Sequence, residues 1–147
     1  MKKFKFRLQT LLDQRKAKEE QIQIEFGELK KKEALEKEKL EKLMLRLEET
    51  LLIIEKALND GEDTAEIQRM FEFANATRED IRIQDLILER IKIDVAKKRE
   101  ELVEAMKDRK VLDTLKEKQE EEYLKECMRL EQNELDEVAS VRYARGG

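Results

Sequence analysis

The sequence contains no proline among its 147 residues, and only one short segment has the composition of a turn. That segment begins with the turn formers Asn59 and Asp60, and it continues with Gly61, a residue type that readily takes the left-handed conformation at a helix end. Asp63 followed three positions later by Glu66 resembles a capping box, which opens a new helix. Because proline and glycine are the main helix breakers, we predict two long helices separated by one turn.

Apolar residues on both sides of the turn recur at the spacing of a coiled-coil seam. Before the turn, the frame runs in alternating steps of three and four from Leu8 to Ala57, and after the turn every seventh residue from Ile67 to Leu102 is apolar. Polar residues interrupt this seam at Arg15, Glu19, Glu33, Glu36, Thr50, Thr77, Gln84 and Lys98. Gly27 lies inside the pattern and is either a tolerated weak point or a mild bend.

These features predict an all-α fold, an antiparallel coiled-coil hairpin formed by two long helices of one chain. The predicted single domain covers residues 1–147, with arm 1 at about 4–58, the turn at about 59–63 and arm 2 at about 64–143. The composition agrees, since 46 % of the residues are charged and 39 % are hydrophobic, which suffices for an apolar stripe but not for a thick layered core.

Arm 2 is predicted to be longer than arm 1. Folding about Gly61 brings Phe4 near residue 118, so that the last ~25 residues of arm 2 have no partner at about 1.5 Å rise per residue. The seam frame slips from about Arg109, and a second apolar run takes over at Leu115, Leu124, Cys127 or Met128, Leu135 and Val138. An unpaired amphipathic helix end indicates a binding surface.

Catalysis, cofactors and metals are not predicted. The chain has no histidine, the commonest general base and metal ligand, and no glycine-rich phosphate loop. Its single cysteine, Cys127, lies beside Met128 on the apolar side of its helix, where a small packed hydrophobe is expected rather than a nucleophile. The chain is therefore predicted not to be an enzyme.

The charge pattern indicates neither nucleic-acid binding nor membrane insertion. The 32 basic and 36 acidic residues are interspersed, with a net charge of −4 rather than one strongly basic face. The longest apolar run, from Leu51 to Ile54, is far shorter than the ~18 to 20 residues of a membrane span. No apolar run follows the positive start, as a secretory signal would require, so a cytoplasmic location is predicted.

The basic start has three interpretations: a solubilising helix end, a lipid-surface helix, or a segment that docks onto an acidic or apolar groove of a partner protein. Its cations are Lys2, Lys3, Lys5, Arg7, Arg15, Lys16 and Lys18, and they alternate with Phe4, Phe6, Leu8, Leu11 and Leu12. A second aromatic cluster, Phe71 and Phe73, either packs at the bend of the hairpin or is exposed as an anchor for a partner.

Both ends of the sequence resemble the FliJ family of flagellar type III export proteins. The match at the start is FRLQTLLDQRKAKEEQ, residues 6–21, and the match at the end covers residues 111–145. The end is the more specific of the two, and it contains Leu115, Lys116, Glu117, Tyr123, Glu131, Gln132, Asp136, Glu137 and Arg142.

The resemblance implies a non-enzymatic stalk similar to the central shaft of rotary ATP synthases. Such a stalk docks into the hexameric flagellar export ATPase, regulates it, and contacts the membrane protein of the export gate to promote export of flagellar proteins. Some members also handle export chaperones. The implied location is cytoplasmic, peripherally associated with the inner membrane at the flagellar base.

The resemblance also implies two sets of partner-binding residues. The gate set is Phe71 and Phe73, and the ATPase set comprises Phe6, Arg7, Leu8, Leu11, Leu12, Arg15, Tyr123, Asp136, Glu137 and Arg142. Two alternatives stay open: a structural coiled-coil rod formed by two chains, and the equivalent stalk of a virulence type III secretion system. A rod has no need for the turn at Asn59, Asp60 and Gly61.

Overall fold

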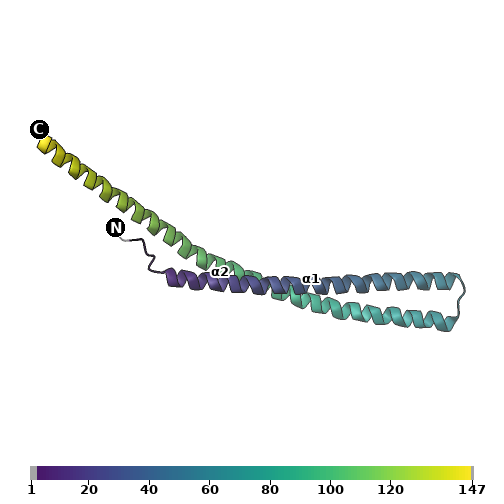
Figure 1. Ribbon diagram of the computed structural model, residues 1–147. Helices are drawn as coiled ribbons and strands as arrows, with labels where there is room; N and C mark the ends of the chain where they lie inside the picture. Colours follow the sequence, from purple (N-terminus) through teal and green to yellow (C-terminus); the bar gives the residue numbers. More distant parts are fainter. Residues whose placement is uncertain (1–2, 147) are drawn as a thin grey trace. The chain divides into compact units, whose positions relative to one another are not determined.

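The computed structural model describes residues 3–146, which form two helices and no strand. Helix α1 spans Gln9–Asn59 and helix α2 spans Thr64–Gly146. The two helices pack against each other in antiparallel directions and are joined by a single turn (Figure 1). This arrangement confirms the predicted all-α antiparallel hairpin, whereas Lys2, a member of the predicted basic start, lies outside the described residues.

The chain divides into two compact units. The hairpin unit, Ile22–Leu102, contains the turn and the helix segments on either side of it. The end unit combines Met1–Gln21 with Val103–Gly147. The single domain over residues 1–147 therefore stays a prediction.

The turn is closed by backbone hydrogen bonds around Gly61, whose φ of 68° is in the left-handed region. The Glu62 N–H donates to the Ala57 carbonyl at 3.1 Å and the Gly61 N–H donates to the Leu58 carbonyl at 3.4 Å. These two bonds form a Schellman motif, which satisfies carbonyls left free at the end of α1. The predicted role of Gly61 follows from this geometry.

Asp63 caps the start of α2, but only half of the predicted capping box forms. The Ala65 N–H donates to Asp63 Oδ1 at 3.4 Å, as expected of an N-cap carboxylate. The Glu66 carboxylate instead accepts from Arg69 at 3.2 Å, on its own helix. Arg69 therefore binds the Glu66 side chain, which in a complete capping box would accept from the backbone at Asp63.

The seam of the hairpin unit follows the predicted heptad frame. Leu40, Ile54 and Ala57 of α1 and Ala74, Leu88, Ile91 and Val95 of α2 are buried. The polar seam residues are also enclosed, and each finds a hydrogen-bond partner. The hydroxyls of Thr50 and Thr77 donate to carbonyls of their own helices, Arg46 at 2.8 Å and Phe73 at 3.0 Å, which removes the cost of burying them.

Helix α1 begins at Gln9 rather than near residue 4. Residues 3–6 lie outside any helix, residues 7 and 8 form a turn, and the Gln9 N–H donates to the Phe6 carbonyl at 3.1 Å. The first turn of α1 carries no acidic residue, and the cations before it oppose the positive end of the helix dipole. The electrostatics of this start therefore disfavour extending the helix toward Phe4.

The seam also continues beyond the predicted slip at Arg109. Within the end unit, Arg109 is half-buried in frame and Leu112 is buried, with 5 % of its surface exposed. Departures from the frame begin at Leu115, which packs against Leu112 and its neighbours, and continue at Cys127, which is half-buried. Of the predicted second run, Leu115 and Cys127 are therefore enclosed, whereas Leu124, Met128, Leu135 and Val138 are exposed.

Candidate partner-binding surfaces

The end unit has a small apolar core built on the first residues of the chain. Phe6, Leu12 and Leu112 are buried, with 7 %, 0 % and 5 % of their surfaces exposed. Phe4, Leu8 and Leu115 pack around them. The non-helical stretch before α1 is thus held against α2 by its aromatic side chains, which is why Phe6 can be buried without belonging to a helix.

Phe4 extends this packing toward the last part of α2. Its ring centroid lies 5.6 Å from that of Tyr123, with the two planes tilted by 42°, a geometry favoured by aromatic pairs. A hydrogen bond with the Cys127 thiol, aided by desolvation, raises the pKa of Tyr123. Tyr123 therefore stays neutral and packs against Phe4.

Arg109 joins the two helices of the end unit electrostatically. Its guanidinium pairs across the seam with Glu19 and along α2 with Asp113, the latter at 2.6 Å. Hydrogen bonds to Glu19 and then to Asp113 raise the pKa of Arg109, so that the group stays charged. Arg15 of α1 donates to the Asp108 carbonyl of α2 at 2.7 Å. The polar seam positions near the N-terminal end thus fasten α1 to α2.

The predicted ATPase-binding residues separate into an enclosed group and an exposed group. Phe6 and Leu12 are buried, Leu8, Arg15 and Tyr123 are half-buried, and Arg7, Leu11, Asp136, Glu137 and Arg142 are exposed. The structure brings Phe6, Leu8 and Leu12 into one cluster. Asp136 lies 13 residues beyond Tyr123 on α2, which is about 20 Å along the helix. The residues of this set therefore do not form one continuous surface.

The last part of α2 exposes an apolar stripe that none of the described residues of the end unit covers. Leu124, Met128, Leu135 and Val138 share one helix face and have 56 %, 69 %, 64 % and 51 % of their surfaces exposed. Side chains of this kind on a solvated helix are typical of a surface that another protein covers. We call these four residues the α2 stripe, and it agrees with the predicted overhang of arm 2.

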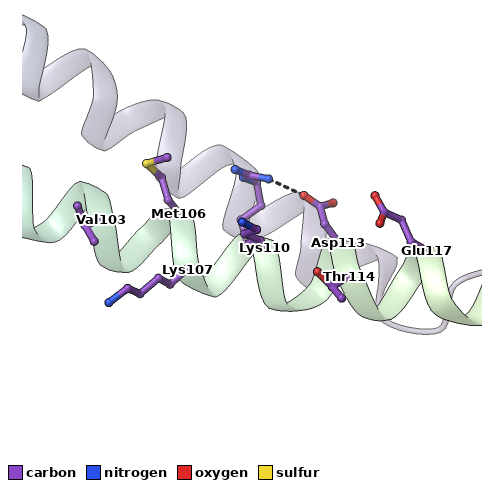
Figure 2. Close-up of a pocket in the computed structure, with 8 residues that line it drawn as sticks. Val103, Met106, Lys107, Lys110, Asp113, Thr114 and Glu117 are labelled. Carbon is purple, nitrogen blue, oxygen red and sulfur yellow. Dashed lines mark hydrogen bonds and ion pairs between the residues drawn. The ribbon is translucent and has the colours of Figure 1, made fainter.

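A shallow groove on α2, which sequence reasoning missed, lies nearer the apolar core of the end unit. Figure 2 shows its lining residues along one helix, with a dashed line marking the ion pair to Asp113. The lining consists of Val103, Met106, Lys107, Arg109, Lys110, Asp113, Thr114 and Glu117. Its residues carry mixed charges and are supplied by α2 alone. The groove offers a contact surface rather than a set of catalytic groups.

Phe71 and Phe73 of the hairpin unit are exposed, with 42 % and 50 % of their surfaces accessible. This exposure favours the anchor interpretation over packing at the bend. Sequence reasoning missed that α1 also exposes large apolar residues close to the turn, among them Met44, Leu51 and Leu58. The sequence contained a signal for them, because each of these residues directly follows a seam residue.

Residues 3–146 contain no group of three or more His, Cys, Asp or Glu side chains arranged to hold a metal ion. Neither helix, within those residues, has an apolar stretch long enough to cross a membrane.

Comparison with protein families identifies one match over nearly the whole chain. The family model described as Flagellar FliJ protein matches residues 4–147. Comparisons with curated proteins and with solved structures give no match.

Proposed function

Because the chain belongs to the flagellar FliJ family and is thus a component related to flagellar export, we propose that it acts as the non-enzymatic stalk of the export ATPase. In this proposal, the end unit docks into the hexameric ATPase and regulates it. The hairpin unit contacts the export gate through Phe71 and Phe73, at the cytoplasmic side of the inner membrane. Export chaperones are further proposed partners.

The observation that carries the ATPase assignment is the α2 stripe. Helix α2 exposes the four side chains of the stripe, Leu124, Met128, Leu135 and Val138. The stripe begins next to Tyr123, whose contact with Phe4 holds the start of the chain against α2. A binding pocket of the ATPase that covered the stripe would remove this apolar surface from water, at roughly 25 cal/mol per Å² buried. Asp136, Glu137 and Arg142 are exposed on the same part of α2 and available for the polar part of this contact, while the exposed Arg7 and Leu11 would contribute from the start of the chain.

The test measures the hydrolysis rate and hexamer population of the flagellar export ATPase with and without the chain. We expect the wild-type chain to stimulate both. The double variant Leu124→Asp/Leu135→Asp should lose the stimulation while keeping its helical circular dichroism, because both side chains are exposed. Leu52→Asp/Leu86→Asp is the matched control, since Leu52 and Leu86 are 61 % and 59 % exposed but lie in the hairpin unit. Full stimulation by the double variant would exclude the α2 stripe as the docking surface.

The gate contact has a separate test. Phe71→Ala/Phe73→Ala should weaken binding to the cytoplasmic part of the export-gate protein by at least tenfold, because exposed aromatic anchors commonly supply ~2 kcal/mol each. Stimulation of the ATPase should stay unchanged in this variant. Unchanged gate affinity would remove Phe71 and Phe73 from the interface.

A further inference from the structure

The hairpin unit has two edges, each formed by the row of side chains that flanks the seam. The Arg99 guanidinium of α2 lies 5.6 Å from the ring centroid of Phe26, an α1 seam residue, and this contact marks one edge. The ion pair of Lys98 with Glu25, at 2.9 Å, marks the other. Steps of seven from Arg99 along α2 lead to Phe71, so that Phe71 lies on the first edge. We call it the Phe71 edge.

The α1 residues on the Phe71 edge follow from the same frame. They lie four positions after the seam residues Phe26, Glu33, Leu40, Leu47 and Ile54, and they are Lys30, Lys37, Met44, Leu51 and Leu58. The edge is therefore charged far from the turn, where Lys30, Lys37 and Arg99 occupy it. Near the turn it carries the apolar residues Met44, Leu51, Leu58 and Phe71, and the one charged residue among them is Arg78, which donates a hydrogen bond to Asn75 of its own helix at 2.9 Å.

The apolar part of the edge is exposed. Met44, Leu51, Leu58 and Phe71 have 50 %, 37 %, 55 % and 42 % of their surfaces accessible. A two-helix coiled coil needs only two apolar positions in each heptad, whereas a third one widens the stripe to that of a helix in a larger bundle. The sequence near the turn thus has the pattern of helices that pack against an additional helix.

A row of carboxylates borders this apolar surface. Glu41, Glu48 and Glu55 lie at heptad spacing on α1, each on the solvent side of the edge, and all three are exposed. None of them has an ion pair within residues 3–146, although other exposed glutamates of the hairpin unit, such as Glu38 and Glu79, pair with cations of their own helix. Residues 47–68 contain seven acidic and one basic side chain, a net charge of −6.

We propose that the Phe71 edge near the turn binds a basic amphipathic helix of a partner protein, which completes a local three-helix bundle. The apolar face of that helix covers Met44, Leu51, Leu58 and Phe71. Lysine or arginine residues along its border pair with Glu41, Glu48 and Glu55. The proposal shares Phe71 with the proposed gate contact and rests on it to that extent, and it adds the chemistry of the binding segment, which the stalk assignment does not specify.

Charge complementarity decides between the occupants of this surface. An anionic lipid surface would be repelled by the net charge of −6 around the turn. The same region of a second copy would be repelled for the same reason. A helix with basic borders both neutralises Glu41, Glu48 and Glu55 and buries the apolar edge.

The test uses a designed amphipathic peptide of about 21 residues, three heptads with leucines on one face and lysines beside them. An otherwise identical peptide carries glutamates in place of the lysines. Fluorescence anisotropy measures the affinity of each peptide for the full chain. We expect the lysine peptide to bind at least tenfold more tightly than the glutamate peptide, and its binding to weaken as the salt concentration rises.

Two charge-reversal variants localise the binding. Glu48→Lys/Glu55→Lys should weaken binding of the lysine peptide at least tenfold. Asp80→Lys/Glu100→Lys makes the same change in net charge on α2 and should leave it unchanged, since both residues are exposed, have no ion pair within residues 3–146 and lie off the Phe71 edge. Met44→Ser/Leu58→Ser tests the apolar part without altering the charge, and it should weaken binding as well.

Several outcomes would overturn this inference. They are equal binding of the two peptides, loss of binding in the Asp80→Lys/Glu100→Lys control, and normal binding by Glu48→Lys/Glu55→Lys. Tighter binding to anionic vesicles than to the lysine peptide, or self-association through Met44 and Leu58, would assign the surface to a different occupant. None of these measurements involves the ATPase, so that they are independent of the test of the stalk function.

Discussion

Neighbouring residues of the same type have opposite environments in this protein, as Leu11 and Leu12 show. Leu12 is fully buried in the core of the end unit, while Leu11 has 37 % of its surface exposed. The seam frame places Leu12, and not Leu11, at a seam position, so this difference could be predicted from spacing alone. Because Leu12 is buried within the chain, we expect its substitution to affect the packing of the end unit directly and the binding of a partner only indirectly.

The first prediction concerns the stability of the end unit. Leu12→Ala should destabilise the packing of residues 3–21 by about 2–3 kcal/mol, because it removes a buried side chain and leaves a cavity. Leu11→Ala should cost less than about 1 kcal/mol. Hydrogen exchange of the amides of residues 9–16 measures both effects locally. Similar exchange in the two variants would show that Leu12 is not enclosed as described.

The second prediction concerns Glu36, whose side chain is only 13 % exposed. A hydrogen bond from Gln84, and then one from Lys39, lower the pKa of Glu36 below its usual value of 4.5. A lowered pKa in the folded state stabilises the fold above the unfolded-state pKa, and this contribution is lost as the pH falls through the folded-state pKa. The hairpin unit should therefore lose stability below about pH 4.5.

Glu36→Gln should lower the urea midpoint at pH 7 and reduce its difference between pH 7 and pH 3. Glu100→Gln is the control, because Glu100 is exposed and has no ion pair within residues 3–146. An undiminished pH dependence in Glu36→Gln would assign the acid sensitivity to other carboxylates.

At the scale of the elements, the two glycines of the hairpin unit have opposite roles. Gly61 has a φ of 68° and closes the turn, whereas Gly27 lies inside α1. A Cβ atom at either position would meet nothing within 4 Å. Backbone conformation alone therefore separates the effects of substituting them.

The third prediction follows from this comparison. Gly61→Ala should destabilise the hairpin by about 1–2 kcal/mol, since a Cβ in the left-handed region is strained. Gly27→Ala should stabilise it by about 0.5–1 kcal/mol, because alanine loses less entropy than glycine in a helix. Urea denaturation followed by circular dichroism measures both. Destabilisation by Gly27→Ala would indicate that Gly27 is needed for a bend or a close approach.

The fourth prediction concerns the end of α2. Beyond Cys127 every described residue is exposed, so this helix segment is stabilised only by its own hydrogen bonds and side-chain pairs such as Arg129 with Glu126. Isolated helices of this length are marginal in water. The amides of residues 130–145 should exchange at least a hundredfold faster than those of residues 84–95, and an added ATPase should slow them. Equal protection in the free chain would contradict the absence of packing there.

At the scale of the whole molecule, the two helices that pack along the seam belong to one chain. This distinguishes the hairpin from a rod in which two chains pair along their length. We predict a monomer of 17.6 kDa by light scattering at low micromolar concentration. A stable dimer whose helices exchanged between chains would favour the rod alternative.

The two helices, the turn between them and the seam of the hairpin unit were determined by the sequence alone, whereas the start of α1 at Gln9 was not. Helix formation and the phase of the apolar stripe depend on residues a few positions apart, so proline content, Gly61 and the heptad frame sufficed to predict the turn and the enclosed positions. Even the polar seam residues, such as Thr50 and Thr77, could be placed in this way. The same frame predicted that the last part of α2 exceeds its partner helix.

Only the tertiary structure decided which residues meet across the seam. The contacts of Gln84 with Glu36, Arg109 with Glu19 and Phe4 with Tyr123 join residues far apart in sequence, and they depend on the register set when the turn closes. Periodicity indicates that a side chain faces the partner helix but not which residue it finds there. For this reason the burial of Phe6, outside any helix, and the unpaired glutamates beside an apolar edge emerged from the structure.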